Sequence, residues 1–216
     1  MPKPIEILKK ELMRKTIHTS GIVIPVAYLF VGRPLMLAWL SVVVIGAIGI
    51  EWARLNKRVG LVELARQEEG ERVAAYVYFA VASLITVFLF PKMVAIAALL
   101  MLCIGDSLVG LLGVLMLVSR RIERVDVKAR RFGRGGIIKD MKASVAAAKD
   151  AELMLSMLLV CFLIGTLFVP PHIAFAGAIG AMLADAIPWQ IWGRILDDNL
   201  TVPLFAGVLM SAISLF

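Results

Sequence analysis

The sequence contains little charge and almost no cysteine. Charged residues make up 18% of the 216 positions, apolar residues make up 61%, and the mean hydropathy is +0.91. This balance excludes an ordinary soluble globular domain. The two cysteines, Cys103 and Cys161, both lie in apolar runs, which argues against a disulfide framework and a thiolate metal site. The first 15 residues hold five Lys or Arg and no apolar run, so we expect no cleavable signal peptide.

What the sequence does have is a series of apolar runs. A helix needs about 20 residues to cross the roughly 30 Å hydrocarbon core of a bilayer. Seven runs approach this length, at about 17–30, 35–53, 73–90, 93–118, 151–169, 172–189 and 201–216. We therefore predict an all-α fold: a polytopic membrane helix bundle of about seven transmembrane helices, forming a single integral membrane domain over 1–216. The alternative is six spans, with the first run lying partly in the membrane interface.

The basic residues are distributed unevenly between the connecting segments. Lys and Arg bias a loop toward the cytoplasm. All but two of the 23 basic residues fall before residue 17, in 54–72, in 119–150 or at Arg194, and the exceptions are Arg33 and Lys92. This predicts a cytoplasmic N-terminus, a C-terminus outside, and a basic cytoplasmic loop at 119–150. The notable polar residues then share the cytoplasmic side of the cell membrane, where we expect any chemistry to take place.

Glu51, Asp106 and Asp185 are the acidic residues of note inside the apolar runs. An ionised side chain at the centre of a membrane helix costs about 2.5–3.5 kcal/mol on insertion scales, so it usually faces the bundle interior and pairs with another group. Asp106 lies about midway along the fourth run and is the strongest candidate for a functional acid. Its alternative role is a hydrogen bond between helices, since neighbouring glycines allow close packing. Glu51 and Asp185 lie nearer the ends of their runs, where water can reach them.

The stretch ELMRKTIH opens the first run. Helix positions three and four apart share a face, so Glu11, Arg14, Lys15 and His18 form one stripe. One interpretation is a basic anchor at the membrane surface with a lone histidine. Against it, His18 lies just inside the apolar run, where a neutral residue would cost less. The alternative is a cationic group that belongs to a site.

The loop at 119–150 is strongly basic and contains GRGG. It could attract anionic lipid headgroups at the cytoplasmic leaflet. It could instead fold over a polyphosphate, with bare backbone N–H groups from the glycines and point charges from Lys139 and Lys142. GRGG is not a Walker A loop, because no Gly-Lys-Ser/Thr follows it.

The stretch DDNLT separates the last two runs. Capping of the final helix by Thr201 or Asn199, with Pro203 in the first turn, would need only one such residue. Asp197 and Asp198 add two carboxylates. Oxygen ligands of this kind suit Mg²⁺, which takes one or two carboxylates together with substrate phosphates. Acids and cations on one membrane face are the groups that metal-assisted phosphoryl transfer uses.

At these stretches the chain resembles the CTP-dependent lipid kinases, which comprise the dolichol or polyprenol kinases, the CTP-dependent diacylglycerol kinases and the phytol kinases. The matching pieces, in order, are ELMRKTIHTSG, IGIEWARL, IGDSLVGLLG and DDNLTVPLFAG. They extend from residue 11 to residue 207, and the first and last are the most specific. Two departures stand out: Val109 replaces a usual Ala, and MKASVAAAKD, with Ala146–Ala148, stands where the family has Lys-Ser/Thr-x-Glu-Gly-Ser. That segment is expected to belong to the nucleotide site, so the second departure bears on the phosphate donor.

The resemblance implies an integral membrane kinase that transfers the γ-phosphoryl group of CTP to the hydroxyl of a lipid alcohol, with Mg²⁺ as cofactor. It implies catalytic roles for Asp106, Asp198 and His18, the two aspartates also holding the metal. It implies supporting roles for Glu51 and Asp185. Phosphate or nucleotide binding would fall to the basic and polar residues of the motifs and the loop, namely Arg14, Lys15, Lys139, Lys142, Asn199 and Thr201. The partners would be CTP, a polyprenol, dolichol or diacylglycerol-like lipid and the bilayer, with no nucleic acid.

Two other functions compete with this one. A CTP:phosphatidate cytidylyltransferase uses the same substrate classes but attacks the α-phosphorus and makes a CDP-lipid; the sequence lacks the GGxxDRxD-like signature of those enzymes. A non-catalytic membrane protein or small transporter would also carry intramembrane acids. A transporter must open its substrate site to each side of the membrane in turn, however, and the short outer turns offer few residues to form the outer opening.

Overall fold

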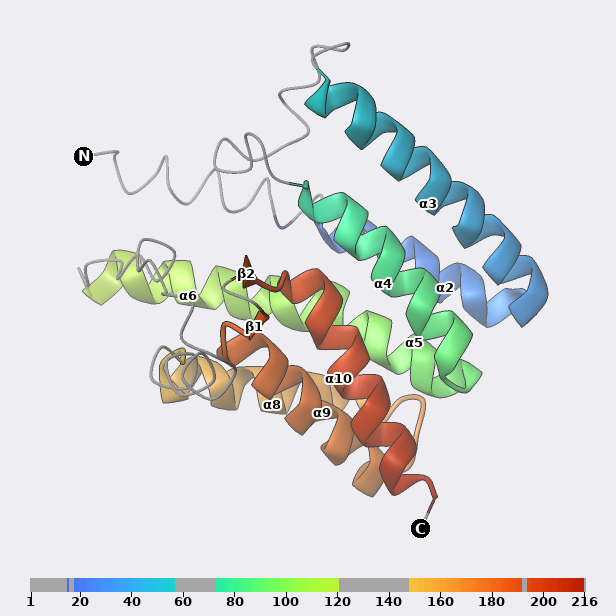
Figure 1. Ribbon diagram of the computed structural model, residues 1–216. Coiled ribbons are helices and arrows are strands. Elements are labelled where there is room, and N and C mark those ends of the chain that lie inside the picture. The colour runs from blue at the N-terminus through green and yellow to red at the C-terminus, as the bar shows by residue number, and fades with distance from the viewer. Residues whose placement is uncertain (1–14, 16–17, 57–72, 121–147, 192–193, 216) are drawn as a thin grey trace.

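The computed structural model describes residues 15, 18–56, 73–120, 148–191 and 194–215, and within them the chain is helical apart from its connections. The described residues form seven apolar helices, the number of apolar runs in the sequence. Figure 1 shows how they are arranged. They are α2 (Val23–Phe30, in a helical segment from His18), α3 (Arg33–Leu55), α4 (Ala75–Leu89), the continuous helix α5–η2–α6 (Lys92–Leu100, Met101–Asp106 and Ser107–Arg120), α8 (Ala151–Gly165), α9 (Pro171–Ala186) and α10 (Asp198–Ile213). A pair of two-residue antiparallel strands, β1 (Gln190–Ile191) and β2 (Arg194–Ile195), joins α9 to α10.

Two of these helices are long and apolar enough to cross a bilayer. They cover Arg33–Leu55 and Lys92–Met116, with 23 and 25 residues. The other five apolar helices have 10–17 residues, which is shorter than a perpendicular crossing of the hydrocarbon core requires. The all-helical fold is therefore confirmed, while the number of spans and their orientation stay predictions.

The core lies along α5 and α10. Residues Ala95–Leu99 of α5 are fully buried, so this helix is surrounded on all sides, as expected of a helix that is apolar all round. α10 packs against α9, α4, α5 and η2, and α8 and α9 form a hairpin beside it. α3 packs mainly on α4 and lies at the edge of the bundle (Figure 1). Many of its large apolar side chains are exposed.

Small residues allow α9 and α10 to approach closely. A Cβ atom at Gly180 would lie 2.6 Å from the carbonyl oxygen of Phe205, and one at Gly177 would lie 2.6 Å from Cγ of Met210. Close backbone approach at Gly and Ala is the usual packing mode of membrane helices, because dispersion contacts rather than the hydrophobic effect hold them together. This contact sets where the end of α9 lies relative to the start of α10.

The connection between α9 and α10 differs from the expectation. The sixth run was expected to reach 189, but α9 ends at Ala186 and the short β1–β2 hairpin follows. The N-cap of α10 is Asp197, whose side chain accepts a hydrogen bond from the backbone N–H of Asn199, so the prediction of a cap at Thr201 or Asn199 was wrong. The physical reason is that Asp197, with extended backbone angles, reaches the free N–H groups of the first turn.

The earlier start of α10 changes the setting of its polar residues. Asp198, Asn199 and Thr201 belong to the first turn of the helix and not to a loop. Pro203 lies inside the helix and not in its first turn, which corrects a second expectation. Since proline has no N–H, the carbonyl oxygen of Asn199 lacks the donor that an α-helix would supply from residue 203.

Candidate functional site: a triad of buried aspartates

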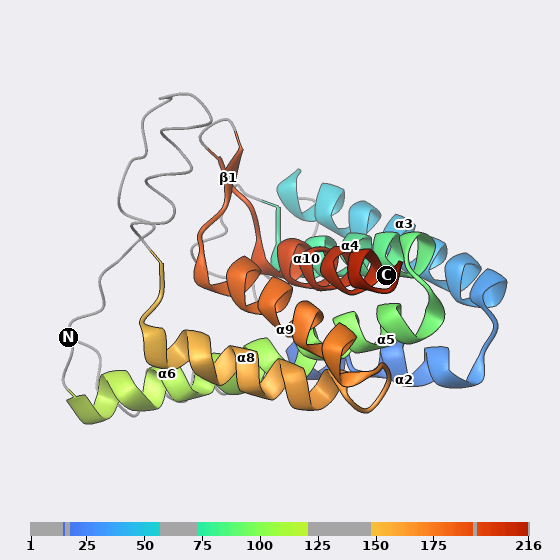
Figure 2. The same cartoon turned by 90° about the horizontal axis from the view of Figure 1, so that it is seen from below.

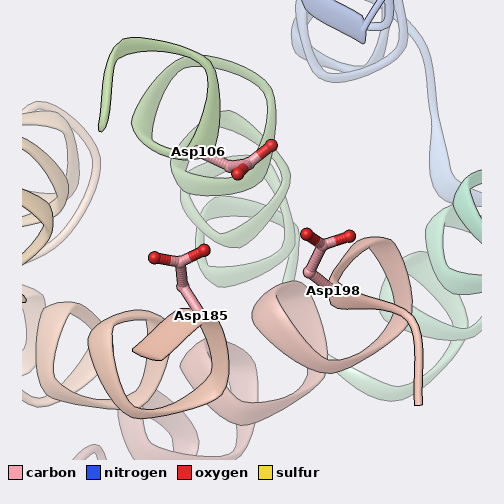
Figure 3. Close-up of side chains that lie close together, drawn as sticks. All are labelled: Asp106, Asp185 and Asp198. Atoms are coloured by element: carbon pink, nitrogen blue, oxygen red, sulfur yellow. The ribbon is translucent and has the colours of Figure 1, made fainter. Parts of the chain in front are cut away.

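Three aspartates from three helices meet inside the bundle. Asp106 closes η2, Asp185 lies in the last turn of α9, and Asp198 opens α10. One carboxylate oxygen of each lies within 4.8 Å of the others. Figure 3 shows the three side chains turned toward a common space. Asp106 and Asp185 are buried and Asp198 is half-buried, and we call these residues the aspartate triad.

The position of Asp106 depends on an irregular helical segment. η2 is a π-helix inserted between α5 and α6, and Asp106 is its last residue. Such segments widen the helix and are frequent at functional sites. η2 contacts both α9 and α10, so a residue in the middle of one long helix meets the ends of two others. α6 continues beyond this point beside α8, as Figure 2 shows.

Lys15 neutralises Asp106. Its ammonium lies 2.7 Å from Oδ2 of Asp106 and also donates to the backbone carbonyl of the same residue at 3.0 Å. Both side chains are 9% exposed. Gly110 makes room for this lysine, because a Cβ atom there would lie 2.6 Å from Nζ of Lys15. The cation is therefore held by two bonds inside a fitted space.

His18 and Thr19 join the same network. Nε2 of His18 lies 3.5 Å from Oδ2 of Asp106 and 3.4 Å from the carbonyl oxygen of Leu102. The hydroxyl of Thr19 lies 3.0 Å from Oγ of Ser107, the residue after Asp106. Lys15, His18 and Thr19 thus bring a cation, an imidazole and a hydroxyl to the helix turn that holds the central acid.

Lys149 neutralises Asp185, and the sequence analysis missed it. Its ammonium lies 2.6 Å from Oδ1 of Asp185, and its backbone N–H donates to the carbonyl of Ala186 at 3.0 Å. Burial by itself lowers the pKa of Lys149, but the charges of Asp185, Asp106 and Asp198 and the hydrogen bond raise it above the ordinary value, so the ammonium stays protonated. The short Pro170–Pro171 turn between the two runs was the available sequence signal, because a hairpin of α8 and α9 places the residues just before α8 opposite the end of α9.

Asn199, which follows Asp198 in the sequence, has a side-chain oxygen that accepts no hydrogen bond from the described residues. The residue is 2% exposed, and its amide nitrogen donates to Oδ1 of Asp197 at 2.6 Å. Within the described part of the chain no donor reaches its Oδ1 atom. A buried amide oxygen without a partner is uncommon and calls for a ligand, ion or water. Thr201, two residues further on, is buried and its hydroxyl lies 3.5 Å from the carbonyl oxygen of Asp197.

Glu51 belongs to a different network. Its carboxylate accepts hydrogen bonds from both the Nε and Nη2 atoms of Arg54, from the backbone N–H of Ala74 and from the hydroxyl of Tyr76. These contacts join the end of α3 to the start of α4. Glu51 is thus not a member of the aspartate triad, whereas Asp185, expected only to support the site, is one. Of the other candidates, Arg14, Lys139 and Lys142 lie outside the described residues, as do Ala146 and Ala147.

The triad offers the donors that a hard divalent cation binds. Mg²⁺ prefers carboxylate, carbonyl and amide oxygens, and here three carboxylates converge while the buried amide oxygen of Asn199 has no donor among the described residues. Lys15 pairs with Asp106 and Lys149 pairs with Asp185, and a divalent cation would supply positive charge that all three carboxylates share. The donor set therefore fits such an ion.

Comparisons with known proteins identify no relative. No family model, no curated protein and no solved structure matches the chain.

Proposed function

We propose that this chain is an integral membrane enzyme that transfers the γ-phosphoryl group of a nucleoside triphosphate, CTP, to the hydroxyl group of a lipid alcohol at the cytoplasmic face of the membrane. The observation that carries the proposal is the aspartate triad, in which acids from three helices converge within 4.8 Å inside an apolar bundle. Residues so costly to bury mark functional sites in membrane proteins. The sequence resemblance described above supplies the class of reaction.

The triad would hold the Mg²⁺ ion. Asp106, Asp185 and Asp198 would be its carboxylate ligands, and the amide oxygen of Asn199 is available nearby in the sequence. When bound, Mg²⁺ neutralises the charge that develops on the phosphate oxygens and holds the nucleotide in place. The loose transition state of phosphoryl transfer needs positioning and charge more than covalent participation by the protein.

The chain's cationic and polar groups would orient the reactants. Lys15 is fixed against Asp106 and keeps that carboxylate in place. His18, 3.5 Å from the same carboxylate, is placed to bind a phosphate oxygen or to take the hydroxyl proton. In the reaction the lipid oxygen bonds to the γ-phosphorus as the bond from that phosphorus to the bridging oxygen breaks. The hydroxyl proton passes to a basic side chain, and the products are CDP and a lipid monophosphate.

The lipid would reach the site from the bilayer. The outer surfaces of α3, α6 and α8 expose large apolar side chains, as a membrane protein requires. Because the acids lie at the ends of α9 and α10, the hydroxyl group of a lipid at the membrane surface can meet them while its chains stay among apolar helices.

The direct test uses purified protein in detergent. The protein is incubated with Mg²⁺, γ-labelled CTP and a panel of polyprenols, diacylglycerol and archaeol-type diethers, and the lipids are separated by thin-layer chromatography. We expect label in a lipid monophosphate. A parallel incubation with α-labelled CTP and phosphatidate distinguishes the cytidylyltransferase, which would label a CDP-lipid. If neither incubation labels a lipid across the panel, the proposal is wrong and a transporter or non-catalytic role gains support.

A further inference from the structure

The two lysines of the aspartate triad are held very differently. The ammonium of Lys15 makes two hydrogen bonds to Asp106 and lies against Gly110, with only 9% of its side chain exposed. Lys149 is 40% exposed, and its ammonium bonds, within the described residues, to one atom of Asp185. The second bond of Lys149 comes from its backbone N–H and so holds the residue but not the charged end of the side chain. The ammonium of Lys149 can therefore change partner, whereas that of Lys15 is fixed.

The partner of Lys149 cannot remain without a cation. The side chain of Asp185 is only 2% exposed, and removing one member of a buried ion pair leaves a costly uncompensated charge. A divalent ion bound to the triad would provide the charge that Lys149 now supplies. An ammonium group and a divalent ion repel each other, so both do not occupy the same carboxylate oxygen. The ammonium would then be free at the edge of the site, on a flexible side chain.

We propose that Lys149 exchanges partners during substrate binding: it neutralises Asp185 in the free protein, and it binds the phosphate oxygens of the nucleotide once a divalent cation occupies the triad. This inference rests on the proposed function and names a further nucleotide-binding residue for it. A lysine suits the role because its ammonium is a compact point charge on four rotatable carbons, as in other phosphate sites. The exchange couples cation binding to nucleotide binding without any movement of a helix.

The exchange predicts two effects of opposite sign. Without the ammonium the triad is more negative and no competitor has to leave, so a divalent cation alone binds more tightly. Without the ammonium the nucleotide loses one phosphate contact, so the nucleotide–cation complex binds more weakly. A purely structural lysine would change both affinities in the same direction or neither.

The experiment measures Mn²⁺ binding by electron paramagnetic resonance on the full chain in detergent. Mn²⁺ stands for Mg²⁺ and needs no turnover. Lys149→Gln should bind Mn²⁺ alone at least about fivefold more tightly than wild type does. It should bind the complex of Mn²⁺ with a non-hydrolysable CTP analogue at least about fivefold more weakly. A factor of about five is the lower end of the usual coupling between two binding sites. Lys149→Arg should retain nucleotide binding. The matched control is Lys92→Gln, which removes one positive charge at a lysine that binds the backbone carbonyls of Leu29 and Val31, and it should behave as wild type.

Each result decides between the two proposals. If the wild type and all variants fail to bind Mn²⁺, the metal site is wrong, and with it both the proposed function and the exchange. If the wild type binds Mn²⁺, Asp198→Asn abolishes this binding, and Lys149→Gln changes neither affinity or weakens both, the metal site stands and the exchange alone is wrong. Tighter Mn²⁺ binding with unchanged nucleotide binding would likewise overturn the exchange, because Lys149 would then be a competitor for Asp185 and not a phosphate ligand.

Discussion

The molecule buries acidic side chains in two places, and the two environments are opposite. The carboxylate of Glu51 is surrounded by four donors: two nitrogens of Arg54, the hydroxyl of Tyr76 and the backbone N–H of Ala74, at 2.7–2.9 Å. The aspartate triad places three carboxylates together with two lysines and one imidazole. The first network surrounds a single carboxylate with donors, while the second brings three carboxylates within 4.8 Å of one another. Burial of an acid therefore does not distinguish structure from function; the convergence of several acids does.

The largest expected effect comes from breaking the triad. Asp198→Asn keeps the side-chain shape and removes one carboxylate charge, so phosphoryl transfer from γ-labelled CTP should fall by about 10²- to 10³-fold, the range seen when one stabilising group is lost from a site. The free energy of unfolding should change much less than the rate of transfer, because the amide keeps the size of the side chain and the acceptor oxygen that the backbone N–H of Asn199 contacts. Thermal denaturation in detergent and the transfer assay measure the two quantities.

The control for this variant is Asp150→Asn. Asp150 is an exposed acid just before α8, and its side chain does not cap that helix. Its replacement should leave both transfer and stability unchanged. Retained transfer in Asp198→Asn would contradict the role of the triad.

The second effect separates the two acid networks. Glu51→Gln leaves the buried guanidinium of Arg54 without its carboxylate, and breaking a buried ion pair typically costs about 3–5 kcal/mol. We expect a large loss of stability in mixed-micelle denaturation, with transfer per folded molecule retained. A variant that keeps its stability and loses transfer would instead place Glu51 in the site, as the sequence alone suggested.

A third, smaller effect tests the fixed lysine. In Gly110→Ala the new methyl group would displace the flexible end of the Lys15 side chain, so the expected cost is the loss of its hydrogen bonds to Asp106, about 1.5–3 kcal/mol for a bond to a charged group. Transfer should fall as well, because Lys15 would leave Asp106. The matched control is Gly46→Ala in α3, where no atom outside the helix's own backbone lies within 4 Å of the added carbon, and which should be neutral or slightly stabilising. Equal behaviour of the two variants would show that Lys15 does not need the space at Gly110.

The smallest effect concerns the attachment of the N-terminal helical segment. Thr19→Val removes the hydroxyl that bonds to Oγ of Ser107 and to the backbone carbonyl of Lys15, and a typical hydrogen bond contributes about 1 kcal/mol. Stability should fall by about that amount, and transfer should change little. Loss of transfer without loss of stability would mean that Thr19 contacts the substrate.

Much of the fold could be predicted from the sequence, because apolar runs of sufficient length leave helices as the main way to satisfy their backbone groups in a membrane. The predicted runs match the observed helices within a few residues, apart from the connection between α9 and α10. The prediction for that connection failed because the N-cap depends on backbone angles. Asp197, Asn199 and Thr201 are all suitable residue types for an N-cap, and only the extended backbone of Asp197 shows which of them caps α10.

The candidate site could be predicted only in part. Asp106 stands out in the sequence because it interrupts a long apolar run, and Asp198 because it lies in a crowded polar stretch. Asp185 and Glu51 looked alike, each an acid near the end of a run, and their neighbours in space decide their different environments. Lys149 was missed because a lysine beside an apolar run resembles a surface anchor until its partner on the next helix is known.

The sequence by itself determined which segments are helices and which residues are too polar for their surroundings, since hydropathy and charge are properties of single residues and their near neighbours. The tertiary structure decided that acids from residues 106, 185 and 198 face one another and that Glu51 does not join them. Contacts between distant segments depend on how helices pack, here on the glycines of α9 and on the widened turn at η2. Those features act across helices, so no local pattern in the chain specifies their result.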